Sequence, residues 1–136
     1  GKANLTITRS QTGDFTRAKG KEVMEGFIKA EAGVANICAV YAHNDDMMVG
    51  AIQAMKAANI DMASVIVSGV DATQDALASM QAGELDITVF QNAAAQGGGA
   101  LDAAVKLSKG EAVEKKVYIP FELVTPANID GYLSKN

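Results

Sequence analysis

Short β-branched segments alternate with longer, proline-free, alanine-rich segments, and this alternation constrains the fold more than any other feature of the sequence. Strands are predicted at residues 4–8, 37–42, 65–67 and 87–90. Helices are predicted between them, at residues 15–31, 45–58, 73–82 and 93–109. Strands that alternate with helices of this length indicate right-handed βαβ units. The expected fold is therefore α/β, with a parallel, doubly wound, Rossmann-like or flavodoxin-like sheet and helices on both faces.

Composition agrees with one packed domain spanning residues 1–136. The chain is 49% hydrophobic and 21% charged, and Met48, Ile52 and Met55 form an apolar stripe on the second predicted helix. The formal net charge of −4, the absence of a basic stripe and the 5% aromatic content argue against nucleic-acid binding. No run approaches the ~20 apolar residues of a membrane span. Residues 1–15 lack a signal-peptide layout, so we expect no membrane insertion and expect any export signal to have been removed.

Three local features carry their own expectations. Cys38 lies in an apolar run, which predicts a buried small hydrophobic residue. Residues 117–119 predict a last strand that Pro120 stops, because proline lacks the N–H that a ladder needs. The glycines at 97–99 interrupt the fourth helix pattern, and they indicate either a close packing surface or a delayed helix start.

Polar residues follow each predicted strand. In such sheets, ligands bind at the carboxyl ends of the strands. Carboxylates, amides and an aromatic ring suit a polyhydroxylated ligand, because carboxylates accept from hydroxyls, amides donate and accept, and a ring packs on a C–H face. No glycine-rich phosphate motif follows any strand, and no cofactor or metal site is predicted. The candidates are residues 12–15 after the first strand, 43–46 after the second, 68–71 after the third and 91–92 after the fourth.

Each candidate also has a purely structural interpretation. Asn44 and Asp71 precede helices, where they would cap exposed N–H groups. Phe15 would be a hydrophobic staple, and Gln91 a solvated strand end. The lone histidine, His43, is expected in a hydrogen-bonded structural role. Asp45 and Asp46 are expected to place negative charge in the first turn of a helix.

Four sequence blocks together resemble the C-terminal lobe of a type I periplasmic sugar-binding protein of the ribose and galactofuranose type. They are residues 12–20, residues 42–47 with Gly50 and Ala51, residues 69–73, and residues 88–91. The resemblance implies sugar contacts from Phe15 as a stacking ring, Asn44 and Asp71 as hydrogen-bonding groups, and Gln91 as the polar residue of the next strand end. Family members often carry a second aromatic residue where this chain has Val70.

The resemblance also implies partners. Such proteins are exported to the periplasm, have two lobes, and deliver a monosaccharide, a pentose or hexose, to the permease of an ABC importer. Residues 92–109 resemble a helix that packs on the N-terminal lobe, which this sequence does not contain. The chain is then one fragment of a cleaved or engineered binding protein, a self-contained flavodoxin-like domain, or a protein whose second copy supplies the missing surface.

Two other function classes stay open, and an enzyme is not expected. A receiver-like phospho-switch would use Asp45, Asp46 and Asp71 around Mg²⁺, although Gln91 and Asn92 stand where such a protein needs a lysine. A sugar-responsive repressor core shares the two-lobed fold. The sequence has no nucleophile paired with a base and no nucleophile elbow, which argues against catalysis.

Overall fold

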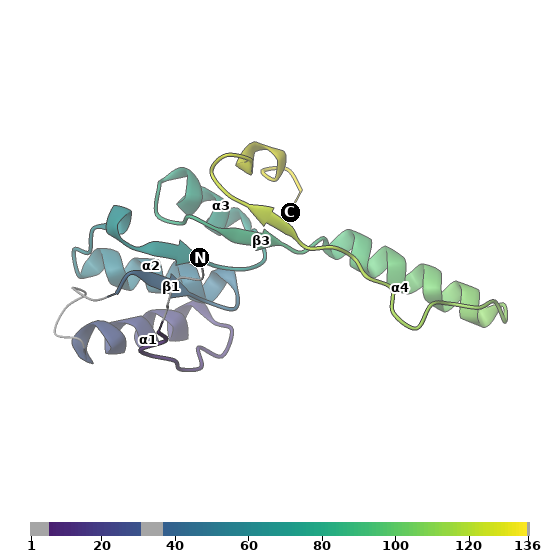
Figure 1. Ribbon diagram of the computed structural model, residues 1–136, viewed down its shortest axis with the longest axis horizontal. Coiled ribbons are helices and arrows are strands. Elements are labelled where there is room, and N and C mark those ends of the chain that lie inside the picture. The colour runs from purple at the N-terminus through teal and green to yellow at the C-terminus, as the bar shows by residue number, and fades with distance from the viewer. Residues whose placement is uncertain (1–5, 31–36, 136) are drawn as a thin grey trace.

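Helices and strands alternate along most of the chain in the computed structural model, which describes residues 6–30 and 37–135 (Figure 1). This order confirms the predicted α/β class. The elements are α1 (Arg17–Ala30), β1 (Ala39–Tyr41), α2 (Asp45–Ala57), β2 (Ile66–Ser68), α3 (Gln74–Gln81), β3 (Thr88–Phe90), α4 (Ala93–Ser108) and β4 (Glu122–Val124), with short 3-10 turns η1 (Met62–Ser64) and η2 (Ile129–Gly131).

The strands lie in the order β1-β2-β3-β4, as two two-stranded sheets, β1-β2 and β3-β4, that isolated bridges join. β1 and β2 pair in parallel. Two isolated parallel bridges, from Ser68 to Ile87 and from Asp71 to Phe90, connect β2 to β3. β4 is antiparallel to β3. The carboxyl ends of β1, β2 and β3 therefore share one edge, where the polar loops converge.

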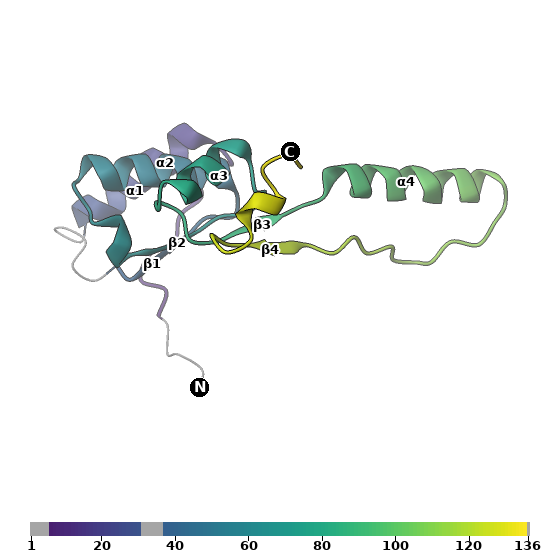
Figure 2. The same cartoon turned by 90° about the horizontal axis from the view of Figure 1, so that it is seen from above.

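Only one face of these strands is covered by the described helices, which differs from the expected cover on both faces. Figure 2 shows α1, α2 and α3 on the same side of the strands. Strand register places Tyr41, Ile66 and Leu123 together on the other face, where they are 60%, 58% and 59% exposed. The difference arises because α4, the next helix in the alternation, runs away from the sheet. The covered face carries the buried residues Val67, Thr88, Phe90 and Val124.

The core forms between that covered face and α2. The predicted stripe of Met48, Ile52 and Met55 is confirmed, because each side chain is at most 2% exposed. α1 packs on α2 through glycines. A Cβ on Gly50 would collide with the backbone at Arg17 and Lys21. The two helices therefore touch backbone to backbone, which side chains of ordinary size would prevent.

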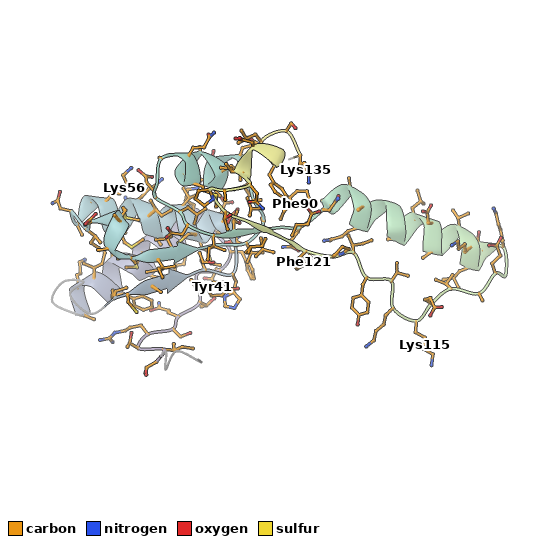
Figure 3. The ribbon with its side chains drawn as sticks, turned by 45° about the horizontal axis from the view of Figure 1, so that its top comes forward. Tyr41, Lys56, Phe90, Lys115, Phe121 and Lys135 are labelled. Carbon is orange, nitrogen blue, oxygen red and sulfur yellow. The ribbon has the colours of Figure 1, made fainter. Side chains whose placement is uncertain are left out.

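α4 and the segment that follows it form an arm that projects from the body (Figure 1). No residue of α4 is buried, and Leu101 and Leu107 are 65% and 63% exposed. Figure 3 shows Lys115 on the distant part of the arm. The helix begins at Ala93 with Asn92 as its N-cap, so the delayed start that the glycines at 97–99 allowed is wrong. A Cβ on Gly97 or Gly98 would meet nothing, whereas one on Gly99 would lie 3.4 Å from the Ile119 side chain, so among the described residues only Gly99 faces another segment.

The last strand lies after Pro120 rather than before it. Residues 117–119 are not in a strand, and β4 forms at Glu122–Val124. Its N–H groups can join the free edge of β3, whereas Pro120 has none to offer. The chain then folds back, so that Tyr132 packs on Phe90 with ring centroids 5.5 Å apart. Figure 3 shows Lys135 close to Phe90, and its ammonium nitrogen lies 5.3 Å from the Phe90 ring centroid.

Two further expectations fail near the first strands. Cys38 is exposed rather than buried, because β1 is the edge strand and no described element packs beyond it. Residues 6–8 of the strand predicted at 4–8 are not in a strand, and residues 4 and 5 lie outside the described residues. Across the described ranges, no helix has both the length and the apolar character needed to cross a bilayer.

Replacing Gly50 by alanine will destabilise the protein, because the new methyl group must force α1 and α2 apart. We expect a loss of about 1–3 kcal/mol in the free energy of unfolding, measured by urea denaturation. Gly26 of α1 is the matched control, since a Cβ there meets nothing. Gly26→Ala is expected to stabilise by about 0.5–1 kcal/mol. Equal stabilities for the two variants would contradict the backbone contact.

Candidate functional site

Three of the predicted site residues, Asn44, Asp71 and Gln91, lie on loops that follow strands, and Phe15 lies on the loop before α1; the structure brings the four together as two pairs. The Gln91 side-chain amide donates to the Asp71 carboxylate over 2.7 Å. The Asn44 side-chain amide donates to the backbone carbonyl of Phe15 over 3.5 Å. The two pairs are joined through the backbone, because the N–H of Asp45 donates to the carbonyl of Val70 over 2.7 Å.

Phe15 is held out of the core by an unusual backbone. Its side chain is 69% exposed, so the interpretation as a hydrophobic staple is wrong. Asp14 and Phe15 have φ values of 49° and 55°, a region that non-glycine residues rarely adopt. Thr12 supports this turn, since its hydroxyl accepts from the Asp14 N–H and donates to the Asp14 carboxylate. Such strain persists only where the surroundings enforce it, and it clusters at functional sites.

Asn44 has the structural role that its position predicted. Its side-chain oxygen accepts from the Met47 N–H over 3.0 Å and caps α2. The capping interpretation is therefore confirmed for this residue. Because the amide nitrogen also reaches the Phe15 carbonyl, Asn44 fixes the Phe15 loop to the start of α2.

Asp71 does not cap α3, because Thr73 does. The Thr73 hydroxyl accepts from the Ala76 N–H over 3.3 Å. Asp71 instead has a φ of 121° and turns its carboxylate to Gln91, which is thus more than a solvated strand end. Burial raises the pKa of Asp71, and the Gln91 hydrogen bond opposes that rise.

An open hollow of about 500 Å³ lies beside this pair. Its size falls within the usual range for small-molecule sites. Two of its lining residues, Gln74 and Gln96, were not predicted. Each lies in the first turn of a helix that follows a strand end, and this placement is the signal that would have identified them. The hollow is lined by Asp71, Thr73, Gln74, Gln91, Ala93 and Gln96.

Asp45 is the main structural residue that the sequence did not reveal. Its expected place in the first turn of a helix is confirmed, but its full burial was not predicted. Its carboxylate accepts from the Thr73 N–H and from the Thr88 hydroxyl, each over 2.9 Å. Burial raises the pKa of Asp45 to about 6, and the nearby Asp71 adds to the rise, while these hydrogen bonds oppose it.

Asp46 takes a different partner from Asp45. The Arg17 guanidinium donates to Asp46 and to Asp75, each over 2.6 Å, and so links the first turns of three helices. Sequence reasoning did not single out Arg17. The three groups are between 39% and 59% exposed, so the ion pairs contribute little stability and act mainly through geometry.

The remaining candidates do not form a catalytic or metal site. His43 is exposed, and its ring meets the Tyr41 ring edge-on at 5.0 Å. Asp45, Asp46 and Asp71 engage different partners, and the described part of the chain has no group of three His, Cys, Asp or Glu residues arranged to hold a metal ion. The receiver-like alternative is therefore not favoured.

Parallel strands whose polar loops meet at their carboxyl ends are typical of α/β domains that bind small ligands. The chain matches the periplasmic binding protein domain family over residues 2–112, and it belongs to that family.

Individual relatives support this assignment. A protein of Rhizobium meliloti named as rhizopine-binding is 54% identical over 132 residues, which are 97% of this chain and 42% of that protein. The galactofuranose-binding protein of Escherichia coli is 48% identical over 84% of this chain and 36% of its own length. An ABC transporter solute-binding protein from Bacillus halodurans, solved with bound myo-inositol, is 41% identical with a TM-score of 0.87, covering 98% of this chain and 45% of that one. The chain thus spans less than half the length of these relatives.

A comparison of Phe15 with Phe90 tests the placement of the Phe15 ring. Phe15→Ala is expected to change the free energy of unfolding by less than about 0.5 kcal/mol, because the ring is 69% exposed. Phe90→Ala is expected to cost about 3–5 kcal/mol, because that ring is only 3% exposed. Chemical denaturation of both variants provides the measurement. A loss at Phe15 comparable with that at Phe90 would show that the Phe15 ring packs in the core.

Proposed function

We propose that this chain supplies one wall of the monosaccharide-binding cleft of a periplasmic solute-binding protein that delivers its ligand to an ABC permease. The observation that carries the proposal is the Asp71–Gln91 pair beside the open hollow, where a carboxylate and an amide meet at 2.7 Å. A carboxylate that accepts from adjacent hydroxyls, next to an amide that donates and accepts, suits a sugar or another cyclic polyol.

Phe15 adds the apolar half of the proposed recognition. An exposed ring on the same edge of the sheet can cover the C–H face of a sugar, and its strained backbone keeps it available for that contact. Asn44 holds the loop that presents this ring, and its amide is the fourth proposed ligand contact. The names of the relatives point to the same ligand class, since they include galactofuranose and myo-inositol.

The other wall of the cleft is proposed to come from an N-terminal lobe. The hollow is open, and all of its lining residues come from the loops and helix starts that follow β2 and β3. α4, within residues 92–109, is unburied along its whole length, which suits a helix that packs on a second lobe. We infer an exported, periplasmic parent protein with a capture role rather than catalysis. The compared relatives are named as binding and transport proteins, which argues against the repressor alternative.

The isolated chain is expected to bind monosaccharides weakly or undetectably by calorimetry. A one-sided site leaves its hydrogen bonds exposed to water, where each contributes only about 0.5–1.5 kcal/mol. Micromolar affinity for a pentose or hexose without any partner would contradict the proposed need for a second wall.

A chimera tests the proposal itself. This chain would replace the aligned 115 residues of the Escherichia coli galactofuranose-binding protein, to which it is 48% identical there. Calorimetry with pentoses, hexoses and myo-inositol is expected to detect binding. Asp71→Asn is expected to weaken that binding about 10- to 100-fold, because it removes a charged hydrogen-bond acceptor.

The matched control for the chimera is Asp130→Asn, an exposed carboxylate in η2 outside the hollow. It is expected to leave affinity unchanged. A folded chimera that binds none of these ligands would refute the proposed function. Equal affinities for the Asp71 and Asp130 variants would remove Asp71 from the proposed site.

A further inference from the structure

The buried carboxylate of Asp45 holds the turn that carries Asp71. One carboxylate oxygen accepts from the Thr73 N–H over 2.9 Å. The other accepts from the Thr88 hydroxyl over 2.9 Å, and the same hydroxyl oxygen accepts from the Ala72 N–H over 3.1 Å. Asp45 therefore holds the two residues that follow Asp71: Thr73 directly, and Ala72 both through Thr88 and through the Ala72 backbone N–H itself.

That turn has a backbone that would not persist without support. Asp71 and Ala72 have φ values of 121° and 55°, both outside the regions that these residues normally adopt. Strained conformations of this kind persist only where the surroundings enforce them. Because charge-assisted hydrogen bonds are roughly twice as strong as neutral ones, an ionised Asp45 is a suitable source of that support.

We propose that Asp45 is a positioning residue whose ionised carboxylate holds the Asp71–Thr73 turn in its ligand-binding conformation, so that capture of a polyol by Asp71 weakens when Asp45 takes up a proton. The ligand part of this inference rests on the proposed function. The part that concerns the turn does not, since it depends only on contacts within the chain.

The surroundings of Asp45 place this proton uptake in an accessible pH range. Burial raises the pKa of Asp45 to about 6, and among the charged groups around it Asp71 adds to the rise. Asp46 and Asp75 are paired with Arg17, which leaves their charges partly compensated. The charged and titratable groups on the elements around Asp45 are Arg17 on α1, Asp46 on α2, Asp71 before α3, Asp75 on α3 and His43 before α2.

The effects of acid on the fold and on the turn have opposite signs. The pKa of folded Asp45 exceeds its ordinary value of 3.8, so the folded chain holds this proton more tightly than the unfolded chain does. Protonation of Asp45 therefore stabilises the folded chain. This stabilisation is fully present below pH 3.8, the ordinary pKa, and is lost as the pH rises through about 6. Acidification to about pH 5 should loosen the turn without weakening the fold through this group. A carboxylate with only a structural role would not loosen the turn at a pH where it leaves the stability of the fold intact.

Nuclear magnetic resonance of the uncomplexed chain tests the positioning role without any ligand. The amide protons of Ala72 and Thr73 are expected to shift together with a midpoint near the pKa of Asp45, about 6, as the charge that supports them is neutralised. The titration is expected to disappear in Asp45→Asn and to persist in Asp71→Asn, which separates the two neighbouring carboxylates. Shifts that are absent in the unmodified chain, or that survive Asp45→Asn, would overturn the inference.

Two more variants complete this test. Asp46→Asn changes the adjacent carboxylate of the same helical turn and is expected to leave the titration intact. Thr88→Val removes the bridging hydroxyl at constant side-chain shape, so the Ala72 shift is expected to shrink to the part that its direct interaction with Asp45 causes, while the Thr73 shift remains. If Asp45→Asn fails to fold, the Thr88→Val pattern decides, and an Ala72 titration as large as in the unmodified chain would overturn the proposal.

The chimera extends the test to ligand capture. Its affinity is expected to fall by about tenfold between about pH 7.5 and about pH 5, because a group with a pKa of about 6 is mostly protonated at the lower pH. In the Asp45→Asn chimera, the loss of affinity on acidification should be smaller, because only protonation of Asp71 then contributes to it. An equal fall in both proteins would overturn the link to capture. Absence of ligand binding at every pH would instead refute the proposed function, while the amide titration would still stand or fall separately.

Discussion

One buried carboxylate connects the parts of this molecule that form the candidate site. Asp45 is fully buried at the start of α2, and its acceptors reach Thr73 before α3 and Thr88 on β3. Removing a charge from water is costly, so such a group is retained only where its hydrogen bonds are well made. The contacts are close enough that a Cβ on Gly69 would collide with the Asp45 carboxylate. The relative positions of the strand-end loops therefore depend on this interaction more than on any surface ion pair.

Glycine contacts on the other side of α2 position the Phe15 loop. Because a Cβ on Gly20 or Gly50 would meet backbone atoms of the opposing helix, α1 lies directly against α2. That closeness brings Arg17, the first residue of α1, within reach of both Asp46 and Asp75. The Phe15 loop precedes α1 and the Asp71 turn precedes α3, so the backbone contact and the Arg17 pairs set the spacing between the proposed stacking ring and the proposed hydroxyl acceptor.

Local pattern predicted most of the elements, while features that depend on distant partners were missed. The four helices were predicted to within two residues at each described end, because their periodicity is local. β4 was misplaced because an antiparallel strand depends on the free edge of β3, which no local pattern reports. The exposure of Cys38 depends on what packs beyond β1. Among site residues, the location of Asp71 and Gln91 at neighbouring strand ends followed from the sequence, but their direct hydrogen bond did not. The burial of Asp45 was not predicted either, since a carboxylate in a first helical turn is usually solvated.

The two faces of the strands explain why the site is built on one side only. Register places Val67, Thr88 and Val124 toward α2 and α3, where they are fully buried, so the strand-end loops rest on a packed core. The opposite face and the arm keep apolar side chains such as Ile66 and Leu101 in water, at 58% and 65% exposure. Exposed apolar surface of this extent is typical of interfaces. A proton on Asp45 would then act on a turn that adjoins the packed face, because Asp71 forms a strand bridge with the buried Phe90. The conformational change would be confined to the Asp71–Thr73 turn, and the exposed apolar strand face and the arm would keep their structure.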